Sequence, residues 1–264
     1  MTTFGWDLCH RCNYACPYCG VWKDHPERDL LLPPAEWEKV WDRIHAAYGG
    51  CRIFVSGGEP SVYPDFFELI GLLAKKHVPD ICTNLSWDVE KLISRLKPGE
   101  LRISATFHPS FADFEEFFEK SLKAKDYLAD AQVYYVVHPD QVEAMPERSR
   151  RFKAAGIKLV PTPLRGEGFM INSEKEKKII RELTPYREGD KVDYQLQDIS
   201  PRGKRCRAGQ DYAVIRYDGK VDRCSQYKDG SAGRINDPDF KLSAEPFRCE
   251  KDYCPIESQW IIKD

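Results

Sequence analysis

Three cysteines near the start of the chain, Cys12, Cys16 and Cys19, follow the spacing C-x3-C-x2-C. Soft thiolate ligands select iron–sulfur clusters, zinc or copper(I). A [4Fe–4S] cube held entirely by protein takes four cysteines, so a loop with three would leave one iron free. A substrate or cofactor could bind that iron. The spacing therefore predicts an open iron–sulfur cluster.

A second interpretation concerns Cys9, which forms a C-x2-C pair with Cys12. Residues 9–19 are then also compatible with a zinc knuckle or a four-cysteine cluster loop. The pairs of a zinc site usually lie about 15–20 residues apart, whereas three residues separate Cys12 from Cys16. This weakens the zinc interpretation, and we expect Cys9 to be a small buried hydrophobic residue.

A second motif, Gly57-Gly58-Glu59-Pro60, directly follows a predicted strand at 52–56. Paired glycines let the backbone approach a ligand closely, and Glu59 offers a carboxylate to an ammonium group. Together with Tyr18, the aromatic residue before the third cysteine, the two motifs in this order resemble the signature of the radical SAM superfamily.

This resemblance implies a catalytic [4Fe–4S] cluster on Cys12, Cys16 and Cys19, whose fourth iron chelates S-adenosylmethionine (SAM). It also implies that residues 57–60 hold the amino group of the methionyl moiety. It places further cofactor contacts at Thr83, Asn84, Ser104 and Thr106 for the ribose and carboxylate, and at Val137 and residues 161–164 for adenine. Strand Ser and Thr side chains commonly bond local backbone groups instead, which is the competing interpretation.

Other polar residues follow or occupy predicted strands. His108 and His138 each precede a proline at a strand exit, where a structural turn competes with a general base. Cys82 lies in the predicted strand 78–83, and a thiol pointing into a barrel could return a hydrogen atom to a substrate radical. Buried packing is the alternative for Cys82.

Four cysteines near the C-terminus form another group, Cys206, Cys224, Cys249 and Cys254. The first two read C-x12-G-x4-C and resemble the start of the SPASM and Twitch auxiliary-cluster domains. The shorter Twitch type, with a second [4Fe–4S] cluster, is the closer match. Structural zinc on the same thiolates is the alternative, and the spacing C-x4-C of the last pair is looser than expected.

The apolar pattern predicts strands at 4–9, 52–56, 78–83, 101–106, 133–137 and 157–160, and helices at 35–48, 65–76, 88–96, 111–122, 140–155 and 173–183. Six β/α units indicate parallel strands with right-handed crossovers, whose active sites lie at the carboxyl ends of the strands. We expect an α/β fold, a partial (β/α)6 TIM-like barrel, although the pattern is also compatible with a doubly wound sheet.

The periodicity fades after Pro185. We expect a barrel over 1–185, a linker over 186–205 and a small Twitch-like domain over 206–264. In that domain Asp218-Gly219 predicts a hairpin between 211–217 and 220–223.

Composition excludes several classes of protein. The chain is 42% hydrophobic and 31% charged, as in soluble globular proteins. A net charge of −2 argues against nucleic acid as a partner. The absence of a signal peptide and of an 18-residue apolar run predicts a cytoplasmic protein that does not bind membranes. In a reducing cytosol the ten cysteines are expected to be ligands rather than disulfides.

The resemblance implies reductive cleavage of SAM to a 5′-deoxyadenosyl radical, which abstracts a substrate hydrogen, with a flavodoxin or ferredoxin as electron donor. A second cluster would accept an electron, which favours a two-electron, dehydrogenase-like oxidation by a radical SAM oxidoreductase. Because few residues precede Cys9, a small polar or sugar-like metabolite ranks first as substrate. The alternatives are a peptide-modifying epimerase or crosslinking enzyme, and a non-catalytic iron–sulfur electron-transfer protein.

Overall fold

Parallel strands with crossover helices form most of the molecule. The computed structural model describes residues 1–19, 29–163, 173–184, 193–194, 199–228, 230–254 and 257–262. Six strands lie in sequence order in one sheet: β1 (Thr3–Cys9), β2 (Arg52–Gly57), β3 (Val78–Thr83), β4 (Arg102–Phe107), β5 (Gln132–Val137) and β6 (Lys158–Pro163). Every neighbouring pair among them is parallel.

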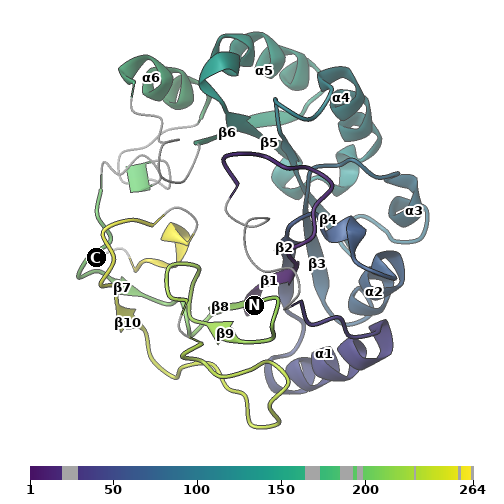
Figure 1. Cartoon of the computed structure of the whole chain (residues 1–264), viewed down its shortest axis with the longest axis vertical. Helices are drawn as coiled ribbons and strands as arrows, with labels where there is room; N and C mark the ends of the chain where they lie inside the picture. Colours follow the sequence, from purple (N-terminus) through teal and green to yellow (C-terminus); the bar gives the residue numbers. More distant parts are fainter. Residues whose placement is uncertain are drawn as a thin grey trace.

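The helices line the outer side of this curved sheet, and the loop that follows β1 lies on its inner side (Figure 1). They are α1 (Pro34–Tyr48), α2 (Phe66–Leu73), α3 (Glu90–Ile93), α4 (Phe114–Lys123), α5 (Met145–Ala154) and α6 (Glu174–Leu183). The predicted α/β partial barrel is therefore confirmed. Within the described residues the sheet does not close, since β6 and β9 are its two edges.

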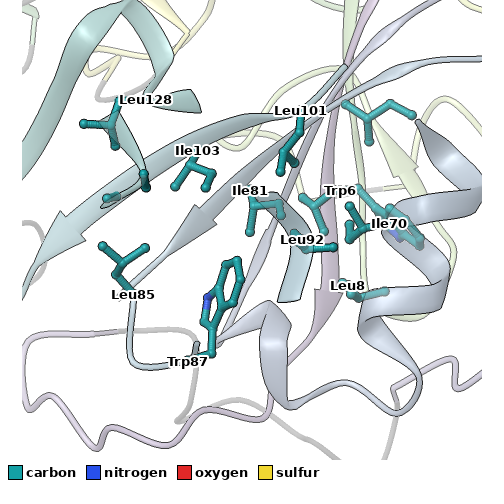
Figure 2. Packing of buried hydrophobic residues seen from close by; sticks show 14 of the residues in the cluster. Trp6, Leu8, Ile70, Ile81, Leu85, Trp87, Leu92, Leu101, Ile103 and Leu128 are labelled. Carbon is teal, nitrogen blue, oxygen red and sulfur yellow. The ribbon is translucent and has the colours of Figure 1, made fainter. Parts of the chain in front are cut away.

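The main core lies between the strands and the helices. Trp6 of β1 packs against Trp37 and Trp41 of α1, with ring centroids 4.6 and 5.1 Å apart. Figure 2 shows Ile81 of β3 among side chains of this core. Ile81 and the three tryptophans are almost fully buried. Alternate strand residues face this core, which leaves the other set on the concave side of the sheet.

Three predicted helices differ from the structure at their starts. The predicted helix 140–155 is divided, because Pro146 has no backbone N–H to donate and so belongs in the first turn of a helix. A 3-10 segment, η5 (Pro139–Ala144), therefore precedes α5. Helix α4 begins only after Asp113, which caps it by accepting a bond from the backbone N of Glu116. Phe111, which lies within the predicted helix 111–122, precedes α4 and is 40% exposed. Helix α3 is also shorter than predicted.

The predicted hairpin is confirmed as β8 (Tyr212–Ile215) and β9 (Val221–Asp222), which are antiparallel. Gly219 in its turn has a φ of 82°, a conformation that glycine adopts readily. Strand β8 also pairs in parallel with β1 and so extends the main sheet. The sheet thus continues across the proposed boundary at residue 206, and the division into domains remains a prediction.

A separate antiparallel ribbon joins β7 (Arg205–Cys206) to β10 (Phe247–Arg248). Most of the predicted linker 186–205, and residue 164 of the predicted adenine site, lie outside the described residues. Among the helices of the described chain, none is both long enough and apolar enough to span a bilayer.

Candidate active site

The end of β2 packs directly on the start of the three-cysteine loop. A Cβ on Gly57 would lie 2.3 Å from the carbonyl oxygen of Cys9, and one on Gly58 would lie 2.1 Å from that of Arg11. Two backbone bonds join the segments, from Gly58 N to Cys9 O (2.7 Å) and from Glu59 N to Arg11 O (2.9 Å). The two glycines therefore allow β2 to contact the three-cysteine loop. The sequence analysis expects them to allow close approach of a ligand instead.

The Glu59 carboxylate is buried and connects the exits of β2 and β3. It accepts bonds from Thr83 Oγ1 (2.8 Å), Asn84 N (2.8 Å) and Ser61 N (3.2 Å). Burial raises the pKa of Glu59, and these three bonds oppose that rise. Pro60, also buried, opens the short helix η2 (Pro60–Val62). The predicted contact of Glu59 with an ammonium group remains a prediction.

Asn84 extends this connection to the three-cysteine loop. Its Nδ2 donates to Asn13 Oδ1 at 2.9 Å, and Asn13 Nδ2 donates to Ser86 Oγ at 2.9 Å. Asn13 lies between Cys12 and Cys16, so the bonds fix the loop against the end of β3. Sequence reasoning missed Asn13, although its place inside the cysteine spacing could have drawn attention to it.

The three thiols of the loop lie close enough to interact electrostatically. Cys16 is buried, and Cys12 and Cys19 are half-buried. Burial raises the pKa of Cys16 to about 11; a hydrogen bond from Tyr18 opposes the rise, and Cys19 and Cys12 add to it. Such thiols lose their protons when a metal ion binds them.

Aromatic side chains pack against this loop. His108 Nδ1, at the exit of β4, lies 3.2 Å from the Tyr18 hydroxyl and 3.8 Å from Cys16 Sγ. Burial lowers the pKa of His108 to about 4, which favours the neutral ring. Tyr14 stacks on Phe111 at 5.6 Å. Tyr18, predicted to contact the cofactor, thus contacts His108, and His138 lies near it with ring centroids 6.1 Å apart.

Three predicted cofactor contacts lie elsewhere in the sheet. Ser104 donates to the buried carboxylate of Asp80 at 2.6 Å, and Asp80 is also bonded to Arg52. Val137 is fully buried in the main core, so its predicted contact with adenine remains a prediction. Thr106 pairs in register with Tyr134 on the same face of the sheet.

Cys82 faces the concave side of the sheet. It pairs in register with Ser104, follows Asp80 at the alternate position of β3, and is half-buried. It therefore lies outside the main hydrophobic core. Its role as a hydrogen donor remains a prediction.

The four C-terminal cysteines gather in one place. Pairing of β7 with β10 sets Cys206 opposite Phe247, two residues before Cys249. Cys224 interacts electrostatically with Cys206 and Cys249, and Cys254 with Cys206 and Cys224. Burial is the main cause that raises the pKa of Cys224 and of Cys254 to about 12.

Both cysteine groups have the soft donors that an iron–sulfur cluster requires. In the ranges that the structure describes, no three His, Cys, Asp or Glu side chains converge as ligands of a single metal ion would. A four-iron cube does not require such convergence, because each cysteine binds a different iron. The three-cysteine loop, fixed by Asn13 and by the backbone bonds to β2, fits an open cube.

Comparison with known proteins identifies the family. A family model described as the radical SAM superfamily matches residues 6–152, which is more than half of the chain. The chain belongs to the radical SAM superfamily. This membership implies a [4Fe–4S] cluster and SAM as cofactors, and it makes the chain a radical SAM enzyme.

Two curated relatives are PqqA peptide cyclases. That of Granulibacter bethesdensis is 28% identical over 163 residues, which cover 57% of this chain and 43% of the relative. That of Gluconobacter oxydans is 24% identical over 245 residues, covering 83% of this chain and 68% of the relative. The chain thus matches less than half the length of the first relative.

A solved structure has a similar fold. Native anSMEcpe with bound AdoMet and Cp18Cys peptide superposes with a TM-score of 0.59, at 17% identity, covering 88% of this chain and 77% of that chain. Identity this low shows the fold alone, which agrees with the partial barrel described above.

Proposed function

We propose that the chain is a peptide-modifying radical SAM enzyme with a second iron–sulfur cluster on its four C-terminal cysteines. The observation that supports it most is the similarity to PqqA peptide cyclases over 83% of the chain. Sequence reasoning ranked a small sugar-like substrate first and a peptide second. The comparisons do not support that order, and they favour the peptide.

The cofactors supply the bond-breaking chemistry: a reduced cluster and SAM together provide a radical that abstracts a substrate hydrogen. We assign the SAM-binding cluster to Cys12, Cys16 and Cys19. Asn13, Asn84 and Glu59 keep their loop fixed against the strand exits, so that the reacting groups are held in position.

Arg216 connects the two cysteine groups through hydrogen bonds. Arg216 of the C-terminal segment bonds to Asp7 of β1 at 3.1 Å and to Asp222 at 2.5 Å. Its Nη2 also donates to the carbonyl of Ser225, next to Cys224, at 3.3 Å. Arg216 therefore connects the strand that leads to the three-cysteine loop with the C-terminal cysteine group.

A cluster held by Cys206, Cys224, Cys249 and Cys254 would supply a one-electron acceptor, so that a peptide that has lost a hydrogen atom would also lose an electron and a proton and be oxidised by two electrons. Without that transfer, a thiol such as Cys82 would instead return a hydrogen atom and invert a stereocentre. Which of the two occurs distinguishes a crosslinking enzyme from an epimerase.

The test is to incubate the anaerobically reconstituted chain in D2O with SAM, dithionite and a peptide encoded beside its gene, and to analyse the peptide by mass spectrometry. Loss of two hydrogens indicates crosslinking or dehydrogenation, and gain of one deuterium without oxidation indicates epimerisation. Cys12→Ala serves as the inactive control. The proposal fails if SAM is cleaved but peptides stay unchanged while a sugar-like alcohol is oxidised.

Iron analysis tests the second cluster separately. Two [4Fe–4S] clusters correspond to about eight irons per chain, and the double variant Cys249→Ala/Cys254→Ala should retain about four. A wild-type value near four would contradict the second cluster.

A further inference from the structure

Basic side chains surround the C-terminal cysteine group. An arginine directly precedes three of its four cysteines: Arg205 before Cys206, Arg223 before Cys224 and Arg248 before Cys249. Lys204 and Lys251 lie beside them. We call these five residues, Lys204, Arg205, Arg223, Arg248 and Lys251, the basic rim.

The β7–β10 ribbon sets Arg205 directly opposite Arg248, and both side chains are exposed. Like charges directly opposite one another destabilise a two-stranded ribbon. Arg248 donates to the carbonyl of Gly203 at 3.0 Å, which leaves its charge unneutralised. The ribbon therefore bears a paired positive charge that an external anion would stabilise.

Aromatic rings hold two further cations next to the ribbon. The Arg223 guanidinium lies 4.8 Å from the ring centroids of both Tyr227 and Phe247, and Lys251 Nζ lies 4.8 Å from that of Tyr227. Cation–π contacts leave the charge in place and restrict where it lies. The cations are thus arranged around one patch.

Neighbouring carboxylates do not cancel this charge. Asp252 is paired with Arg202, and Asp211 is paired with Arg207. Glu250 is exposed between Cys249 and Lys251, and the buried Glu257 lies near Cys206, Cys224 and Cys254. None of the five rim cations forms an ion pair with a carboxylate in the part of the chain that the structure describes, so the patch keeps an excess of positive charge on a chain whose net charge is −2.

Residues of the rim are next to buried thiols in the sequence. Cys206, Cys224 and Cys254 are 5%, 6% and 8% exposed, and Cys206 pairs across the ribbon with Phe247. A protein docked on the rim would therefore sit close to any cluster that these cysteines hold. Electron-transfer complexes are typically small and transient, and complementary charge speeds their association.

We propose that the basic rim is the docking surface for an acidic one-electron carrier protein of the flavodoxin or ferredoxin type. This rests on the proposed function, because the carrier exchanges an electron with the cluster on the C-terminal cysteines. That cluster, reduced by one electron from the substrate radical, passes the electron to the oxidised carrier. The carrier gains one electron, and no bond forms or breaks.

The test mixes the cluster-loaded chain, reduced with dithionite and then desalted, with an acidic flavodoxin in its oxidised state, under anaerobic conditions in a stopped-flow instrument. Flavin absorbance reports the second-order rate of electron exchange at low and high KCl. The test variant is Arg205→Glu/Arg248→Glu. The matched control is Arg95→Glu/Lys97→Glu, which changes two exposed cations near α3, on the far side of the sheet from the ribbon (Figure 1).

We expect the test variant to slow exchange at least tenfold at low salt and to lose most of the salt dependence, whereas the control keeps the wild-type rate. A neutral variant, Arg205→Gln/Arg248→Gln, should fall between them and covers the case in which charge reversal impairs folding. Dithionite-driven SAM cleavage, which needs no docking, should be unchanged in all variants.

Equal rates in the test and control variants would overturn the proposal. The absence of electron exchange between flavodoxin and the wild-type protein would also overturn it. A third contrary result would be that the Arg205→Glu/Arg248→Glu variant loses binding of an oligonucleotide but keeps the wild-type rate of exchange with flavodoxin. The failure of the proposed function has a different signature: unmodified peptide, with carrier exchange still dependent on the rim.

Discussion

Gly58 offers the sharpest perturbation of the contact between β2 and the three-cysteine loop. In Gly58→Ala the new Cβ would lie 2.1 Å from the carbonyl oxygen of Arg11 and 2.6 Å from that of His10. Ordinary contact begins near 3.4 Å, so the two backbones must separate by about 1.3 Å. Backbone atoms on both sides leave no flexible side chain that could move instead.

The cost follows from the contacts that this separation breaks. Overpacking costs about 1–3 kcal/mol, and loss of the bonds from Gly58 N and Glu59 N costs about 1 kcal/mol each. We therefore expect destabilisation by about 3–5 kcal/mol, or a fall in Tm of about 10 °C for a chain of this size. The loop should also lose its iron, about half of the total if two clusters are present.

Gly71 supplies the matched control. It lies in α2, and a Cβ there would meet no atom within 4 Å. Gly71→Ala should stabilise the chain by about 0.5–1 kcal/mol, because alanine favours a helix. Urea unfolding and iron analysis of both variants make the comparison. If Gly58→Ala kept wild-type stability and iron, the assigned role of the glycines would be wrong.

Three further predictions concern buried polar groups. Burial lowers the pKa of His77 below 6.5. As pH drops through about 6.5 the unfolded chain therefore binds a proton that the folded chain does not, and the free energy of unfolding falls. Urea unfolding at about pH 7.5 and 5.5 should show a smaller difference in stability for His77→Gln than for the wild type, and an equal difference would contradict the prediction. Asp80→Ala removes the buried carboxylate that pairs with Arg52 and should lower the free energy of unfolding by about 3 kcal/mol. An unchanged urea midpoint would refute this. Asn84→Ala removes the bond to Asn13 and should speed chelator removal of iron from the three-cysteine loop, with the C-terminal iron as internal control.

Local sequence patterns predict the barrel well because each β/α unit forms from contiguous residues. Strand β3 has the predicted bounds, Val78–Thr83, and the hairpin turns at Gly219 as predicted, although its connection is longer than two residues because Ile215 pairs with Val221. The pairing of β8 with β1 has no local signal, because it joins segments about 200 residues apart.

The sequence predicts which cysteines are candidate ligands, a role that remains a prediction, and says less about the residues that surround them. The cysteine spacings and the Gly57–Pro60 motif are short and continuous in sequence. The contacts of His108 with Cys16 and of Asn84 with Asn13 join residues 92 and 71 positions apart. Such contacts depend on how the strand exits converge, which periodicity does not report.

Formation of 5′-deoxyadenosine tests the central claim most directly. The wild-type chain, reconstituted anaerobically and reduced with dithionite, should convert SAM to 5′-deoxyadenosine and methionine, and added SAM should change the EPR signal of its cluster. The triple variant Cys12→Ala/Cys16→Ala/Cys19→Ala should form none while retaining iron at the C-terminal cysteines. A wild-type loop that holds zinc, or a reduced cluster that ignores SAM, would contradict the account.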